Sequence, residues 1–299
     1  MYLVDFEGAR ARGGVRWPDF VCVGAQKSAT TWLDTVMRDQ SDLYLPPIKE
    51  VHYFSQLYNR DVRGYGPQFR AQQIADRRSA MAAKHELPEN SRAIEEVLAH
   101  LEQPEIDDHW YGGIFARAPT NSVCGEICPS YMNLPVAGVR HLLDSCANVK
   151  ILVLVRDPVQ RCWSHIRMHV MQGYLDRNFD RLVSGEVSLL PYLFYTDYAS
   201  SLRMWRAYTQ PGRLKILLHD DILADGAAAL KEIRQFVGLE HRPAPASVSK
   251  QVLKGHQIEM PRNLHAKLFE KLAPQYEYLH DEFPERVGQW LENHRAALA

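Results

Sequence analysis

The chain has 299 residues, of which 46% are hydrophobic and 24% are charged, as in an ordinary soluble globular protein. Its 35 basic and 36 acidic residues give a net charge of −1 at pH 7, so no overall positive field attracts nucleic acid. No stretch approaches the roughly 20 apolar residues that a membrane span requires. The N-terminus also lacks the apolar core of a secretion signal. These totals argue against a nucleic-acid-binding or membrane-spanning protein.

Five cysteines are scattered through apolar runs. An odd number in such positions predicts reduced thiols and a cytoplasmic location rather than a disulfide framework. Cys124 and Cys128 have no second Cys/His pair at ligand spacing, so we expect no metal site. The five residues are Cys22, Cys124, Cys128, Cys146 and Cys162.

The first third of the chain begins with a Gly/Arg-rich lead-in over residues 1–17. A short apolar strand is expected at 19–23 and a helix from about 28 to 38. Residues 56–108 are polar, and no Gly/Ser linker separates them from the rest of the chain. We therefore interpret them as a mainly helical insertion rather than a domain, and expect it on the acceptor side. Within that insertion, surface helices are expected at about 67–84 and 90–102.

The strongest strand signal is the continuous apolar run at 150–155. Such a run is typical of a central parallel strand that is covered on both faces. Other strands are expected at 123–127 and 214–218, and helices at 135–144, 159–172, 195–208 and 226–237. This alternation predicts an α/β fold: one domain over residues 1–299, with a central, mostly parallel sheet flanked by helices.

The turn between the first strand and the first helix has the features of a phosphate site. Backbone N–H groups at a helix start attract anions, and Lys27 adds a positive charge beside hydroxyl-bearing residues. A triphosphate loop would read Gly-x4-Gly-Lys-Ser/Thr. Here Gly24 precedes Lys27 by only three residues, and the second glycine is missing. The turn therefore suits a single phosphate, with an ordinary strand-to-helix turn as the alternative.

Arg156 follows the strongest strand, at the edge where open α/β sheets bind ligands. Ser164 lies eight residues further along, in the following helix, and the pair could hold a second phosphate group. The alternative is a strand-end salt bridge from Arg156 to Asp157, with a solvent-facing serine. A kinase would instead need a Mg²⁺-holding aspartate at a strand end.

The segment that contains Lys49, Glu50 and His52 offers a carboxylate beside aromatic residues. Glu50 is a candidate general base for a substrate hydroxyl. In an extended segment Glu50 and His52 would share one face, although the prolines before them also allow a loop that leads into a helix. The alternative is a solvated Lys–Glu pair.

Lys254, Gly255 and His256 lie in a polar loop rich in serine and lysine. A glycine between two basic residues could form a lid that closes over bound phosphates. A plain surface loop is the alternative.

Taken in this order, the segments resemble the PAPS-dependent sulfotransferases (PAPS is 3′-phosphoadenosine 5′-phosphosulfate). The closest resemblance is to the branch with the heparan sulfate sulfotransferases and their bacterial relatives. It extends from about residue 19 to 285, and the ordered set is more specific than any one motif. The similar segments are Gly24–Trp32, Lys49–Phe54, Gly125–Tyr131, the Arg156-Asp157-Pro158 motif with Arg161 and Ser164, and Lys254–His256.

The resemblance implies the P-loop-like sulfotransferase fold, and transfer of a sulfuryl group from PAPS to a hydroxyl or amine, with PAP as the product. It assigns Glu50 as the base, Lys27 as the group that stabilises the leaving phosphate, and His52 as a residue that orients Glu50 or the acceptor. No metal is required. The residues implied to bind the co-substrate are Gly24, Ala25, Gln26, Lys27, Ser28, Ala29, Thr30 and Thr31 for the 5′-phosphosulfate, and Arg156, Ser164, Lys254, Gly255 and His256 for the 3′-phosphate and the closing loop.

The acceptor is expected to be a small molecule, lipid or carbohydrate rather than a long polyanion. The chain is not basic overall, and Ile127 stands where several glycosaminoglycan enzymes of the family carry a substrate-contacting lysine. Four aromatic residues, Tyr53, Phe54, Trp110 and Tyr111, either line the acceptor pocket or pack in the core. Rival interpretations are a P-loop nucleotide kinase and a non-catalytic nucleotide-binding protein of the same fold.

Overall fold

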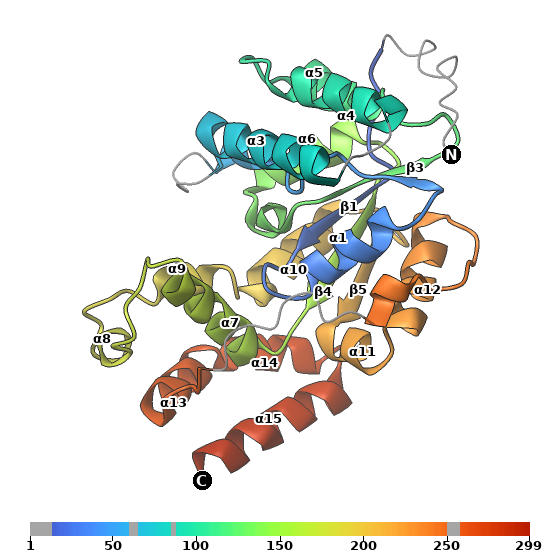
Figure 1. The fold of residues 1–299 in the computed structure, drawn as a ribbon. Coiled ribbons are helices and arrows are strands. Elements are labelled where there is room, and N and C mark those ends of the chain that lie inside the picture. Colours follow the sequence, from blue (N-terminus) through green and yellow to red (C-terminus); the bar gives the residue numbers. More distant parts are fainter. Residues whose placement is uncertain (1–13, 60–64, 85–87, 250–257) are drawn as a thin grey trace.

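A computed structural model gives the fold and describes residues 14–59, 65–84, 88–249 and 258–299 (Figure 1). Its centre is a five-stranded sheet with the order β2-β3-β1-β4-β5, in which each neighbouring pair is parallel. This architecture confirms the predicted α/β fold with a parallel sheet. The strands are β1 (Phe20–Gly24), β2 (Leu43–Tyr44), β3 (Val123–Ile127), β4 (Lys150–Val155) and β5 (Leu214–Leu218).

The apolar runs of β1 and β4 are continuous because both faces of the sheet are covered. Since side chains alternate along a strand, Phe20 and Cys22 enter one core layer, while Val21 and Val23 enter the other. β4 alternates in the same way. The layer that contains Phe20 is completed by α1 (Thr30–Arg38), α11 (His219–Ala224) and α12 (Gly226–Val237).

The opposite face carries the larger core layer and most of the helices. In Figure 1, α3–α6 gather at one end of the molecule and α13–α15 at the other. The helices outside the Phe20 layer are α2 (Tyr53–Tyr58), α3 (Pro67–Lys84), α4 (Pro88–Leu101), α5 (Asp108–Phe115), α6 (Val136–Ser145), α7 (Pro158–Met171), α8 (Asp180–Ser184), α9 (Leu190–Phe194), α10 (Tyr198–Tyr208), α13 (Arg262–Lys271), α14 (Ala273–His280) and α15 (Pro284–Leu298).

Most of the predicted elements are present near their expected positions, including both helices of the insertion. The helix expected from 195 begins at Tyr198, because the Asp197 side chain accepts a hydrogen bond from Ser200 N and caps it there. The two-residue strand β2 and the helices α13–α15 are not among the elements predicted from the sequence. Of the helices described, none is long and apolar enough to cross a membrane.

Candidate active site

The strand order places a ligand crevice next to β1. The chain passes from β1 to β2 and β3 on one side of the sheet and then crosses to β4 on the other side. Parallel α/β sheets bind ligands at the carboxyl ends of the strands where the direction of winding reverses. The segments that leave this point are the loop 25–29 after β1 and Arg156 after β4. The topology therefore brings the two predicted phosphate motifs to the same edge.

Four non-glycine residues have a left-handed backbone within the described part of the chain, and all four lie in two loops of this region. Lys27 and Ala29 have φ of 71° and 70°, and Glu50 and His52 have φ of 61° and 59°. Each such conformation costs on the order of 1–3 kcal/mol and persists only where its surroundings enforce it. We name these segments the donor loop (Gly24–Thr31) and the base loop (Lys49–His52).

The donor loop is shaped by Gly24 and by the start of α1. A Cβ atom at Gly24 would lie 2.8 Å from Cβ of Met132, so no larger residue fits there. Ala29 is the N-cap of α1 and supplies no side-chain hydrogen bond, which leaves the first amides of the helix without an intrahelical partner. The Ser28 side chain is fully buried beside the Tyr198 phenol, and its hydroxyl makes no well-formed hydrogen bond within the described residues. These groups fit an anion.

Positive charge accumulates around Lys27. Burial, followed by the charges of Arg156, Arg161, Arg167 and Lys49, lowers the pKa of the Lys27 ammonium to about 8. Lys49, one of these four neighbours, is itself paired with Glu50. Gathering cations in a partly buried site is costly, and a bound polyanion would reduce that cost.

Arg156 connects the two phosphate motifs directly. Its Nη1 donates to the backbone carbonyl of Lys27 at 3.1 Å. Its side chain is half-buried, and burial lowers the pKa of its guanidinium. Asp157 forms no ion pair with Arg156 in the described structure, and its Oδ1 accepts a hydrogen bond from Gln160 N at 2.7 Å, which caps α7. Ser164 lies half-buried on α7, and no hydrogen bond between described residues joins it to Arg156.

The base loop brings Glu50 between two basic groups. Its Oε1 accepts a 2.7 Å hydrogen bond from Lys49 Nζ, and its Oε2 lies 3.4 Å from His52 Nε2. Burial alone would raise the pKa of Glu50, but the His52 hydrogen bond and the Lys49 charge outweigh it and lower the pKa to about 2. Lys49 Nζ also lies 3.4 Å from Thr31 Oγ1, which ties the base loop to the donor loop. Glu50 is therefore ionised at neutral pH.

His52 is held on both sides of its ring. Its Nδ1 lies 2.9 Å from Ser130 Oγ, and its ring stacks on Tyr65 with 4.1 Å between the centroids. Phe69 meets the same ring edge-on, and the Tyr65 hydroxyl bonds that of Tyr195 at 2.8 Å. The expected pairing of Glu50 and His52 is present, but the loop that leads into α2 produces it, and the extended alternative is wrong.

Glu126 is a buried carboxylate that the sequence analysis did not single out. It lies on β3 and accepts hydrogen bonds from Val51 N at 3.1 Å and from the hydroxyls of Tyr111 and Tyr131. Burial raises the pKa of Glu126 to about 7, and the nearby charge of Glu50 adds to this rise. Because Val51 separates the two left-handed residues, Glu126 fixes the backbone of the base loop. A glutamate in the otherwise apolar run Val123–Ile127 was the available signal.

The four aromatic residues proposed for an acceptor pocket are core residues. Tyr53, Phe54, Trp110 and Tyr111 are buried and pack against one another. Core packing, the alternative interpretation, is therefore correct for all four. The rings that contact His52 instead come from the insertion, and one of them, Tyr65, is hydrogen-bonded to Tyr195 after α9.

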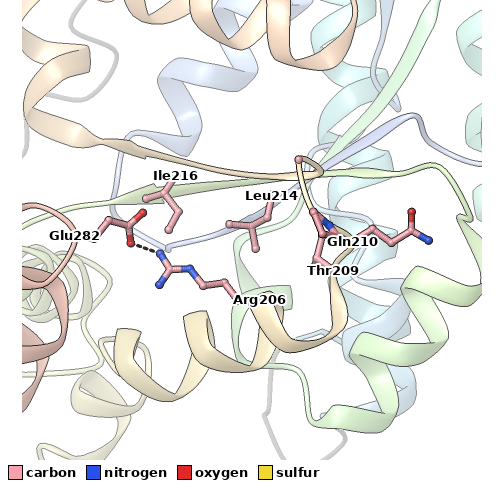
Figure 2. A pocket seen from close by; sticks show the side chains of 8 residues that line it. Arg206, Thr209, Gln210, Leu214, Ile216 and Glu282 are labelled. Atoms are coloured by element: carbon pink, nitrogen blue, oxygen red, sulfur yellow. Dashed lines mark hydrogen bonds and ion pairs between the residues drawn. The ribbon is translucent and has the colours of Figure 1, made fainter.

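Two further features lie outside the candidate site. The predicted closing loop of Lys254, Gly255 and His256 falls outside the residues that the structure describes. Figure 2 shows a surface pocket of about 290 Å³ next to β5, where Arg206 pairs with Glu282. None of the residues that line this pocket belongs to the donor loop, the base loop or the Arg156 motif.

Comparison with known proteins gives the family. The sequence model described as "Sulfotransferase family" matches residues 18–243, about three quarters of the chain. A membrane-associated sulfotransferase, kil1, from Dictyostelium discoideum is 23% identical over 181 residues, which are 58% of this chain and 29% of that protein. The chain thus spans less than a third of that relative's length.

Two solved structures share the fold. A sulfotransferase from Alicyclobacillus acidocaldarius has a TM-score of 0.68 and 20% identity, over 92% of this chain and 99% of the other. The sulfotransferase domain from the curacin biosynthetic pathway has a TM-score of 0.50 and 19% identity, over 82% of this chain and 80% of the other. At these identities the likeness establishes the fold alone.

Proposed function

The chain belongs to the sulfotransferase family, and we propose that it transfers the sulfuryl group of PAPS to a hydroxyl or amine of a small-molecule, lipid or carbohydrate acceptor. The observation that carries this proposal is the cluster of cationic side chains around Lys27, whose pKa is lowered to about 8 by burial and then by four cationic neighbours. A nucleotide with a 5′-phosphosulfate and a 3′-phosphate brings negative charge to this cluster.

The donor loop and Arg156 divide the nucleotide between them in this proposal. The first amides of α1, the Ser28 hydroxyl and Lys27 bind the 5′-phosphosulfate. Arg156 and Ser164 bind the 3′-phosphate, with the loop of Lys254, Gly255 and His256 closing over it. The hydrogen bond from Arg156 to the Lys27 carbonyl supports this division, because it fixes the spacing of the two phosphate sites.

Glu50 acts as the base in the transfer step. It accepts the proton of the acceptor hydroxyl or amine while the acceptor oxygen or nitrogen forms a bond to sulfur. The bond from sulfur to the bridging oxygen breaks, and the electron pair stays on the 5′-phosphate of PAP. Lys27 stabilises the charge that grows on that oxygen. Glu50 is ionised at neutral pH and can therefore accept a proton, and the contact with His52 orients it.

The acceptor approaches past the rings that surround His52. Tyr65 and Phe69 come from the insertion, and both contact the His52 ring. Their uncharged faces support a small or apolar acceptor rather than a long polyanion. The free, buried thiols of all five cysteines support a cytoplasmic location.

The proposal is tested by incubating the full chain with PAPS and a panel of hydroxyl- and amine-bearing compounds. PAP release is measured by chromatography and the sulfated product by mass spectrometry. Acceptor-dependent release of PAP is the expected result. Mg²⁺-dependent turnover of ATP without PAPS turnover would overturn the proposal in favour of a nucleotide kinase. Binding of PAP without transfer to any acceptor would leave a nucleotide-binding protein of this fold.

A further inference from the structure

A buried polar network joins the C-terminal helices to the Arg156 motif. Its members are Asp157 at the start of α7, His265 on α13, Tyr276 on α14 and His294 on α15, and each is less than 10% exposed. The helices α13–α15 lie beyond residue 243, where the family match ends. The network therefore lies partly outside the segment that matches the family model, yet it reaches a residue next to the proposed 3′-phosphate site.

The contacts converge on the Asp157 carboxylate. His294 Nε2 lies 2.8 Å from Oδ2, and the Tyr276 hydroxyl lies 3.2 Å and 3.3 Å from the two carboxylate oxygens. Gln160 N donates to Oδ1 at 2.7 Å. His265 Nε2 lies 2.7 Å from His294 Nδ1 and extends the chain of hydrogen bonds.

One arrangement of protons satisfies all of these contacts. His265 Nε2–H donates to His294 Nδ1, and the Tyr276 hydroxyl donates to Asp157. His294 Nε2–H is shared between Asp157 Oδ2 and the Tyr276 oxygen, which lies 2.9 Å away. Burial lowers the pKa of His265, which agrees with its neutral form. Asp157 then accepts three hydrogen bonds from one side, and its negative charge is fully engaged.

The network matters for Arg156 because it holds the carboxylate of the next residue, Asp157. Arg156 is the preceding residue, and a free Asp157 carboxylate would be the natural ion-pair partner for its guanidinium. In the structure, Arg156 Nη1 instead binds the Lys27 carbonyl, and Asp157 points to the C-terminal helices. A carboxylate that paired with Arg156 would compete with an incoming phosphate.

We propose that His294, together with Tyr276 and His265, is a positioning residue that keeps Asp157 away from Arg156, so that the guanidinium stays open to the 3′-phosphate of the donor. This inference rests on the proposed donor site. It assigns α13–α15 a part in the choice of nucleotide: they favour a 3′-phosphorylated nucleotide over one without that phosphate. A purely structural network would change the binding of both nucleotides alike.

The test compares PAP with AMP, which shares the 5′-phosphate but lacks the 3′-phosphate, by calorimetric titration of the full chain. His294→Phe should weaken PAP binding about tenfold and leave AMP binding unchanged, because Asp157 is released to pair with Arg156. The double variant His294→Phe/Asp157→Asn should recover most of the PAP affinity, since asparagine still caps α7 but carries no charge.

Two more variants keep the test decisive. Val287→Ala removes buried volume from α15 without touching the network, so it should lower the melting temperature while the PAP/AMP affinity ratio stays at the wild-type value. Tyr276→Phe deletes one hydroxyl and should shift the PAP/AMP affinity ratio in the same direction as His294→Phe. It therefore replaces His294→Phe in the test if His294→Phe does not fold. An unchanged ratio in Tyr276→Phe or His294→Phe, or no recovery in the double variant, would overturn the inference alone. Absence of PAP binding by the wild-type chain would overturn the donor site and the inference together.

Discussion

The donor loop and the base loop meet at the same edge of the sheet but have opposite electrostatic character. Burial, followed by the positive charges of four neighbouring side chains, lowers the pKa of Lys27 to about 8. Glu50 lies between Lys49 and His52, and its contacts with them outweigh the effect of burial and lower its pKa to about 2. The donor side therefore gathers cations that suit an anionic ligand, while the base side is already assembled.

In the proposed reaction, this difference fits a base loop that accepts the proton of the acceptor and a donor loop that binds the nucleotide. Preorganised groups need little rearrangement at the moment of reaction, and Glu50 has its partners in place. The donor loop instead gathers positive charge that an anionic ligand would offset. Substitutions in the base loop should therefore change turnover with little effect on nucleotide affinity, whereas substitutions in the donor loop should change both.

The largest effect is expected for Glu50→Gln, which removes the base and keeps the shape of the side chain. Turnover should fall by about 10²–10⁴-fold, the usual contribution of a positioned base, while the affinity for PAP stays near wild type. Steady-state kinetics measures the turnover, and calorimetry measures the affinity for PAP. Glu105→Gln, on an exposed loop, is the matched control. Full activity in Glu50→Gln would show that another group takes the proton.

Lys27→Ala tests the other side of the comparison. Turnover should fall by about 10²–10³-fold, because the charge that stabilises the leaving phosphate is lost. PAP affinity should fall as well, unlike the result for Glu50→Gln. Lys231→Ala, on the exposed face of α12, should leave both quantities unchanged. A normal PAP affinity in Lys27→Ala would separate Lys27 from the donor and contradict the proposed division of roles.

Local sequence signals were sufficient for the donor side. The apolar run of β4 and the glycine after β1 each specify a strand end, and the rule for parallel sheets then brings Lys27 and Arg156 to one edge. The base side was harder to predict. Glu50 and His52 meet through two left-handed residues, and Val51 N is fixed by Glu126, 75 residues away along the chain. Such a backbone has no composition signal, since neither left-handed residue is glycine.

Long-range pairs explain the remaining misses. Asp157 looked like a partner for its neighbour Arg156, but its partner is His294, 137 residues away. The same limit applies to the acceptor side, because the sequence alone does not distinguish aromatic residues that pack in the core from those that line a pocket. Tyr53 and Tyr111 stack on each other in the core, while Tyr65 stacks on His52. Residue type and spacing predicted the chemistry of the candidate site, and only tertiary packing decided between such neighbours.

Glu126 provides a third test, through the dependence of stability on pH. Its pKa is raised from 4.5 to about 7 in the folded protein, so between these values the folded chain keeps a proton that the unfolded chain has lost. The free energy of unfolding should therefore fall, by about 3 kcal/mol, as the pH rises from 4.5 through 7. Glu126→Gln should abolish this contribution, whereas the exposed Glu292→Gln should retain it. Urea unfolding at pH 5 and pH 8 measures the change in the free energy of unfolding. An equal change between these pH values in wild type and Glu126→Gln would refute the assignment.

The smallest effect concerns protons taken up when the donor binds. At pH 8 about half of the Lys27 side chains carry a proton, because the pKa is about 8. A bound polyanion favours the charged form, so PAP binding should take up about half a proton at pH 8, where the phosphates of PAP, with a second pKa of about 6, are already ionised. Titrations in two buffers with different ionisation enthalpies measure this uptake. Lys27→Arg is the control, because arginine stays protonated throughout and should abolish the uptake. Uptake that persists in Lys27→Arg would assign the proton to another group, and the lowered pKa of Lys27 would no longer distinguish the donor loop from the base loop.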